Sequence, residues 1–132
     1  MWTIRTLGAI ALVMAGSTWL WLTPAFAGER VSTAGALWWI SGLLSFVTIG
    51  GFCVATAGLV ARQPWWEATA LASAAVGLVV LVPYGIAAAR GGEATGSWVW
   101  NVVVHLLILA GIAALLLVPV LERWVDQQVM GP

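Results

Sequence analysis

The sequence predicts an all-α membrane protein, a four-span antiparallel transmembrane helix bundle with both termini on the same side. The 132 residues are 62% hydrophobic and only 8% charged, whereas an ordinary soluble domain carries about 25% charged residues. Four apolar runs, at about 4–26, 34–61, 65–89 and 98–121, are each long enough to cross a bilayer core of ~30 Å. Only short polar segments separate them, so we expect residues 1–132 to form a single four-helix transmembrane domain.

Composition also excludes several classes of function. The five basic and five acidic residues give a net charge of zero, and no basic run exists, so nucleic acid is not an expected partner. Cys53 is the only cysteine, which excludes an intrachain disulfide and a cysteine-based metal cluster. All basic residues are Arg, and Ala, Gly, Val and Trp are abundant. This bias is typical of a GC-rich genome, and we expect a bacterial protein.

The first run, 4–26, has two interpretations. Arg5 before an apolar core, followed by Ala25 and Ala27 in an A-x-A pattern, resembles a secretory signal peptide that would be cleaved after residue 27. The run is longer than the usual signal core of about 7–15 residues, and Trp19 and Trp21 suit a helix end at the membrane interface. We expect an uncleaved first span, with cleavage of residues 1–27 as the alternative.

The second and third runs are separated by a tight turn. At 28 residues, the run 34–61 would rise about 42 Å as a helix, so it should tilt or project beyond the hydrocarbon. Arg62-Gln63-Pro64 stops it. In the run 65–89 that follows, Pro64 and Glu67 suit the first turn of a helix. Near its end, Pro83-Tyr84-Gly85 should kink or terminate the helix.

The fourth run, 98–121, follows a flexible loop, 90–96, and contains Pro119, which should bend or end the helix. The polar residues 122–128 beyond it read as a short amphipathic segment at the membrane surface. Four spans place Arg5, Arg62 and Arg123 on one side and Arg30 and Arg90 on the other. Three arginines against two favour cytoplasmic termini in a bacterial inner (plasma) membrane.

Tryptophan positions agree with this topology. All ten fall near expected interfaces, as an aromatic belt requires: Trp2, Trp65, Trp66 and Trp124 on the side of the termini, and Trp19, Trp21, Trp38, Trp39, Trp98 and Trp100 on the other. Small and hydroxyl residues mark expected helix contacts. They form stripes at Gly8/Ala11/Ala15/Thr18, Ser41/Ser45/Thr48, Gly51/Ala55/Gly58 and Thr69/Ser73/Gly77.

The candidate site lies in the fourth run, which holds the only Asn and the only His of the chain, Asn101 and His105. They are four residues apart, and Trp98 lies three residues before Asn101, so all three share one face of a helix. Polar side chains inside a membrane span are costly unless they are paired. Trp98, Asn101 and His105 are therefore the candidate cofactor-binding residues.

Two interpretations of this face stay open. His105 could ligate haem or a chlorophyll-like magnesium, or hydrogen-bond to a quinone or lipid head group. Alternatively, His105 or Asn101 could bond to a hydroxyl on a neighbouring helix, an interaction worth about 0.6 kcal/mol on average. The hydroxyls considered are Ser41, Ser45, Thr48, Thr69 and Ser73. The structural interpretation is favoured, because a bis-His haem needs a second His.

Catalytic chemistry is not readable in the sequence. No span carries an ionisable Asp, Glu, Lys or Arg at its centre, where ion-coupled transporters usually place one, and no catalytic, metal or phosphate-binding motif is present. We expect a non-enzymatic accessory or scaffold component of a larger membrane assembly. Its partners would be the lipid bilayer and other membrane subunits, or further copies of itself in a homo-oligomer. The alternatives are a binder of an apolar cofactor or lipid through Trp98, Asn101 and His105, and an enzyme acting on lipid head groups with Glu29 and Glu93.

Overall fold

The structure, a computed structural model, describes residues 3–22, 36–90 and 95–131, without the side chains of 95–97. Within these ranges the chain is helical apart from short turns. The elements are α1 (Ile4–Ser17), the 3₁₀ helix η1 (Thr18–Leu22), α2 (Ala36–Val60), α3 (Trp66–Arg90), α4 (Thr95–Leu117) and α5 (Pro119–Val129). The signal-peptide motif around Ala25 and Ala27 and the carboxylates Glu29 and Glu93 lie outside the described residues.

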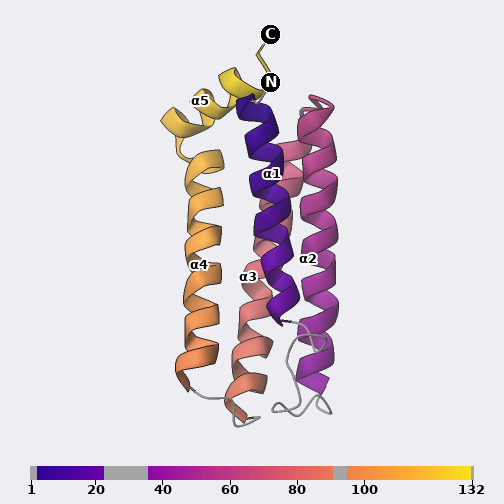
Figure 1. Cartoon of the computed structure of the whole chain (residues 1–132), viewed down its shortest axis with the longest axis vertical. Coiled ribbons are helices and arrows are strands. Elements are labelled where there is room, and N and C mark those ends of the chain that lie inside the picture. Colours follow the sequence, from indigo (N-terminus) through magenta and orange to yellow (C-terminus); the bar gives the residue numbers. More distant parts are fainter. Residues whose placement is uncertain (1–2, 23–35, 91–94, 132) are drawn as a thin grey trace.

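Four long helices run antiparallel (Figure 1). Ile4–Leu22, Ala36–Val60, Trp66–Arg90 and Trp98–Leu117 are each long and apolar enough to cross a membrane. The start of α1 and the end of α5 lie at the same end of the bundle, where Nε of Arg5 donates a hydrogen bond to the carbonyl oxygen of Val129 at 3.1 Å. The predicted all-α, four-span bundle with its termini on one side is confirmed.

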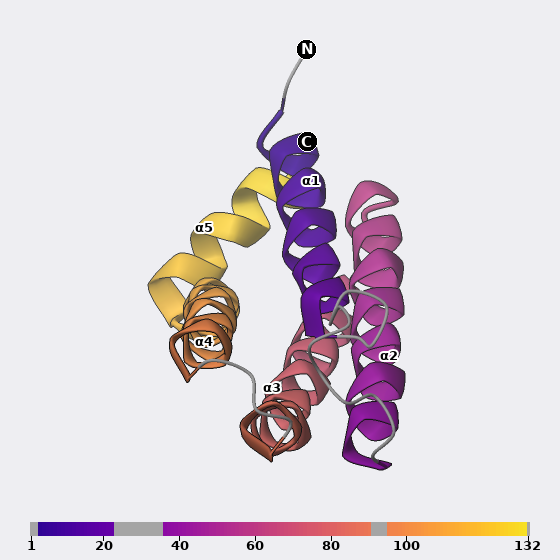
Figure 2. The ribbon, with the colours of Figure 1, turned by 60° about the horizontal axis from the view of Figure 1, so that its bottom comes forward.

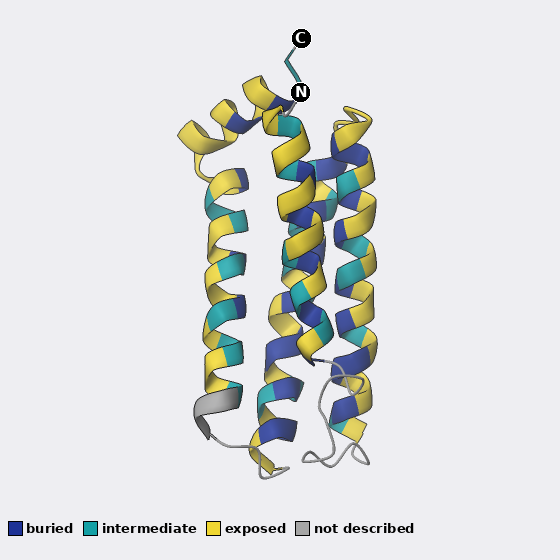
Figure 3. Cartoon of the chain, in the orientation of Figure 1, coloured by how far each residue is buried: buried dark blue, intermediate teal, exposed yellow. Residues whose placement is uncertain are grey.

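The helices pack in chain order, α1 on α2, α2 on α3 and α3 on α4, and the α2–α3 contact is the most extensive. Figure 2 shows α4 on the opposite side of the molecule from α2. The buried residues concentrate on the facing sides of α2 and α3, while α4 is mostly exposed or half-buried (Figure 3). The core therefore sits around α2 and α3, and α4 is a peripheral helix.

Small residues allow the close approach of these helices, as in other membrane bundles. A Cβ added to Gly16 would lie 2.8 Å from Cβ of Phe52, and one added to Gly58 would lie 2.6 Å from the Trp65 ring. Contact also occurs between Gly51 and Ser73. The stripe expected on the first helix lies only partly at its contact with α2: a Cβ added to Gly8 would lie 3.6 Å from Leu59 of α2, whereas Ala11 is exposed. The buried face of α1 consists of Ala9, Leu12 and Gly16, because this is the face that α2 covers.

The turn between α2 and α3 closes with a Schellman motif. Gln63 N donates to Gly58 O at 2.8 Å, and Arg62 N donates to Leu59 O at 3.2 Å. Arg62 adopts the left-handed conformation, with φ 55°, at the position that glycine usually occupies. Glu67 lies in the first turn of α3, which begins at Trp66, where a negative charge suits the helix dipole.

Prolines act differently in the two later helices. Pro83 lies inside α3, which continues to Arg90, so the alternative that the helix terminates there is wrong. Pro119 does end a helix: α4 stops at Leu117, four residues before the expected end, and Pro119 is the first residue of α5. The short helix α5 buries Val125 and Val129 and exposes Glu122, Arg123 and Asp126. It lies across the ends of α4 and α1 (Figure 1), as expected for an amphipathic surface helix.

Candidate functional site

The candidate face of α4 takes part in a chain of polar contacts that links three spans. Nδ2 of Asn101 donates to Oη of Tyr84 on α3 at 2.9 Å. Nδ1 of His105 lies 2.6 Å from the carbonyl oxygen of Asn101, one turn earlier in α4. Nε2 of His105 lies 3.1 Å from the carbonyl oxygen of Thr18, the first residue of η1. We call Thr18, Tyr84, Asn101 and His105 the polar bridge.

The bridge is buried between aromatic rings. His105 is 2% exposed and Tyr84 is also 2% exposed. Trp19 meets the imidazole edge to face, with ring centroids 4.7 Å apart, and Trp38 meets Tyr84 in the same manner at 5.9 Å. Edge-to-face packing is favourable because the positive edge of one ring meets the negative face of the other.

The Trp19 indole is fixed by ring packing and by a hydrogen bond of its own. Its ring is fully buried and lies 5.9 Å, centroid to centroid, from Phe52. Its Nε1 donates to the carbonyl oxygen of Gly77 at 3.2 Å, midway along α3. The expectation of an interfacial Trp19 is therefore wrong: its indole points into the bundle, where Gly77 leaves the necessary space. Trp38 and Trp66 are buried as well.

Of the three candidate residues, the structure brings Asn101 and His105 into the bridge and leaves Trp98 beside it. Trp98 is half-buried and packs against the core, and a Cβ added to Gly85 would lie 3.7 Å from its ring. Sequence reasoning missed Tyr84 and the Thr18 carbonyl. The spacing in the sequence could have predicted the Tyr84 contact. Tyr84 and Asn101 each lie seven residues from the loop 91–94, which places them at equal depth in antiparallel helices.

The hydroxyls named as partners from the sequence make other bonds. Thr48, Thr69 and Ser73 donate to carbonyl oxygens four residues earlier in the chain, at 2.9, 3.0 and 2.7 Å, as helical Ser and Thr commonly do. Ser41 donates to the carbonyl oxygen of Leu22 at 3.3 Å. Ser45 Oγ is buried without a hydrogen-bond partner among the described residues.

The geometry of His105 limits its chemistry. A ligand to haem iron or magnesium needs a nitrogen lone pair that faces open space, whereas both ring nitrogens here face carbonyl oxygens. A neutral imidazole carries a proton on only one of its two ring nitrogens. One of the two contacts is therefore a donated hydrogen bond, and in the other the unprotonated nitrogen faces a carbonyl oxygen. In the part of the chain that the structure describes, no group of three His, Cys, Asp or Glu side chains could hold a metal ion.

Comparison with known proteins gave no match. No protein-family model matches the chain, and no match was found among curated proteins or solved structures.

Proposed function

We propose that the protein is a non-catalytic accessory or scaffold component of a larger membrane assembly, placed in a bacterial inner membrane with its termini in the cytoplasm. The observation that carries the proposal is that two polar side chains of α4, Asn101 and His105, face inward. Asn101 and His105 bond to Tyr84 and to backbone carbonyl oxygens. They hold α3, α4 and η1 together and present no reactive group to the outside.

Support also comes from the position of α4 at the edge of the fold. It packs against α3 and, at its end, against α5, while its outer surface exposes large apolar side chains such as Trp100, Val103 and Leu106. An apolar outer face suits lipid and a membrane-embedded partner equally, because lipid tails are as apolar as Leu. Partner recovery is therefore the decisive measurement.

The test is purification from the native membrane in mild detergent, followed by native mass analysis. We expect the protein to run with other membrane subunits or as a homo-oligomer. Val103→Trp, which adds a ring to the outer face of α4, should reduce recovery of the partner. Val54→Trp, at an exposed position on α2, is the matched control. A strictly monomeric wild-type protein without a partner would contradict the proposal.

Binding of a cofactor through Trp98, Asn101 and His105 is less favoured by the geometry, because His105 would have to leave one carbonyl oxygen to offer a nitrogen. An absorbance spectrum of the purified protein tests it directly. A visible band that disappears in His105→Leu would support the cofactor site and displace the accessory role as the first interpretation.

A further inference from the structure

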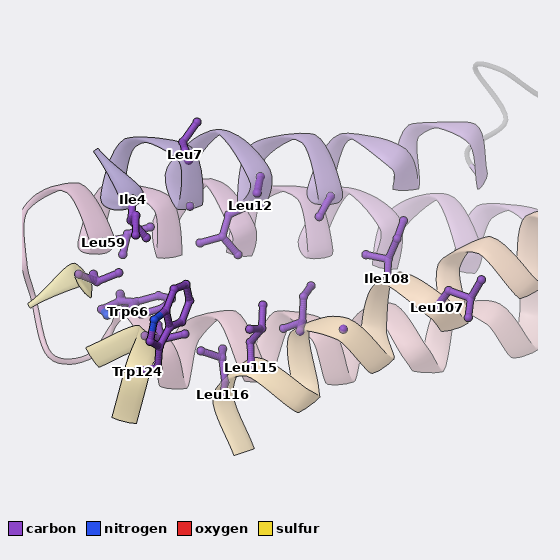
Figure 4. Close-up of a pocket in the computed structure, with 17 residues that line it drawn as sticks. Ile4, Leu7, Leu12, Leu59, Trp66, Leu107, Ile108, Leu115, Leu116 and Trp124 are labelled. Atoms are coloured by element: carbon purple, nitrogen blue, oxygen red, sulfur yellow. The ribbon is translucent and has the colours of Figure 1, made fainter. Parts of the chain in front are cut away.

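A long apolar cavity lies between α1 and α4 on the terminus side of the polar bridge. Its volume is about 560 Å³, within the ~300–1,000 Å³ range of ligand pockets. It is lined by α1 from Ile4 to Ala15 and by α4 from Leu107 to Leu116, with Trp66, Trp124, Val125 and Val129 also in the wall. Figure 4 shows Leu12 directed towards α4, and Ile108 and Leu115 directed towards α1.

The cavity is bounded at both ends by contacts already described. At the inner end, His105 reaches the Thr18 carbonyl oxygen, three residues beyond the lining residues Ala15 and Ile108 along each helix. At the outer end, α5 lies across α1 and α4, with Val125 and Val129 against them. Between these ends α1 and α4 make little contact, so the cavity opens sideways into the hydrocarbon of the membrane.

We infer that this cavity holds one acyl chain of a zwitterionic membrane phospholipid. The lining side chains are apolar apart from the indoles of Trp66 and Trp124, so water would lack the two to four polar partners that it needs. An empty cavity would deprive its walls of dispersion contacts. A hydrocarbon chain is the occupant that the surrounding bilayer supplies.

The length of the cavity suits an extended chain. The lining follows α1 from Ile4 to Ala15, a length of about 16 Å on a helix, and α4 from Leu107 to Leu116. An extended hydrocarbon chain can lie along this length between the two helices. A helix of another subunit is the competing occupant, and the labelling experiment below distinguishes the two.

The charges at the outer end match a zwitterionic head group. Arg5, next to the lining residue Ile4, uses Nε to bind Val129 O, and a guanidinium carries further N–H donors that suit a phosphate. Arg123 lies on α5 beside two carboxylates, Glu122 and Asp126, whose charge suits an ammonium. The head group would lie at the water interface beside α5, and its chain would pass beneath α5 between α1 and α4.

The test uses vesicles of phosphatidylcholine in which a small fraction carries a diazirine in one acyl chain. After irradiation, peptide mass analysis locates the labelled residues. We expect labelling to concentrate on lining residues that face inward, such as Leu12, Ile108 and Leu116, above the level at Leu43 and Phe46, which are exposed on α2.

Gly111→Phe should abolish this enrichment, because a Cβ on Gly111 meets nothing within 4 Å and the ring would fill the cavity that Gly111 lines. Gly50→Phe is the matched control, since Gly50 also has no neighbour within 4 Å but does not line the cavity. Ala11→Phe fills the cavity from the other wall and replaces Gly111→Phe if that variant does not fold.

Equal labelling of the lining and of the outer α2 face would overturn the inference, since it would mean ordinary contact with surrounding lipid. Unchanged enrichment in both cavity-filling variants would also overturn it. Protection of the lining by a co-purifying polypeptide would also overturn it, because a protein partner would then occupy the cavity, and that result would support the accessory role. Equal labelling of the two faces while a partner is still recovered would overturn the lipid inference alone, so the two failures are distinguishable.

Discussion

His105 reaches the first transmembrane helix through one atom: its Nε2 lies 3.1 Å from the carbonyl oxygen of Thr18. Its Nδ1 lies 2.6 Å from a carbonyl oxygen of its own helix. Only the Nε2 contact can tie α4 to η1, while the Nδ1 contact would merely fix the ring within α4. Substitutions that preserve one nitrogen position and not the other can separate the two.

We predict that His105→Gln is about as stable as the wild type, whereas His105→Asn and His105→Leu lose about 0.6 kcal/mol of unfolding free energy, the average for an interhelical hydrogen bond in a membrane, with about 1.7 as the upper limit. The amide nitrogen of Gln is as many bonds from Cα as Nε2 of His, so it can donate to Thr18 O. The amide nitrogen of Asn corresponds to Nδ1 and falls short. Thermal or detergent-induced unfolding measures the difference.

The opposite ranking would contradict this assignment. If Asn matches the wild type and Gln does not, the bond within α4 is the stabilising one. Loss of a bound chromophore in both Gln and Leu variants would instead identify His105 as a ligand, because an amide cannot replace the imidazole.

The bond between Asn101 and Tyr84 predicts energetic coupling between α4 and α3. A double-mutant cycle with Asn101→Leu and Tyr84→Phe should give a coupling energy of about 0.6 kcal/mol, with about 1.7 as the upper limit for such bonds. The cycle is needed because Tyr84 takes part in another interaction as well. Thr56→Val is the control partner, since Thr56 Oγ1 donates to Phe52 O in its own helix, and it should be additive with Asn101→Leu.

The contact of Trp19 with Gly77 predicts a specific packing effect. A Cβ at Gly77 would lie 2.7 Å from Cζ2 of Trp19 and 3.1 Å from Cγ2 of Thr48. Because the indole is enclosed by Phe52 and His105, it cannot move aside, and Gly77→Ala should cost about 1–3 kcal/mol. Gly50→Ala, with no neighbour within 4 Å, should be neutral or slightly stabilising. Equal melting temperatures of the two variants would contradict this packing.

The four spans could be predicted from the sequence because a bilayer leaves a single apolar segment little choice but a helix. Length and lack of charge then suffice to find each span. The positions of the helix ends depend on the surroundings of individual prolines. Pro83 stays inside α3, since membrane helices tolerate proline where neighbours satisfy the freed backbone groups. Pro119, followed by the polar residues of α5, does mark an end.

The location of the candidate site could be predicted from the sequence, but the hydrogen-bond partners of Asn101 and His105 could not. Unpaired Asn and His are costly in a membrane, and this alone pointed to Asn101 and His105. We expected their partners among Ser and Thr, but three of those hydroxyls donate to carbonyl oxygens four residues earlier in the chain. The Thr18 carbonyl has no sequence signal, because its place beside His105 depends on how α1 and α4 are arranged.

Trp19 shows the limit of the aromatic-belt rule. The rule describes indoles that face lipid and water, and it cannot tell which side of a helix end faces the bundle. Gly77 on α3 removes the side chain that would occupy the ring's place. A cluster of small residues on one helix therefore left room for a large residue on another, a pairing that only the packed structure reveals.

The last prediction concerns the orientation of the bundle in the membrane. From the predicted four-span topology we expect residues 30 and 90 on one side of the membrane and residues 62 and 123 on the other. In a Cys53→Ala background, which removes the native thiol, Arg30→Cys and Arg90→Cys should react with a membrane-impermeant maleimide from the outside of intact cells. Arg62→Cys and Arg123→Cys should react only in inverted vesicles, because the proposed orientation places the termini and the α2–α3 turn in the cytoplasm. Labelling of positions 30 and 62 from the same side would mean that α2 does not cross the membrane, and labelling of 62 and 123 from outside would reverse the orientation while leaving the fold intact.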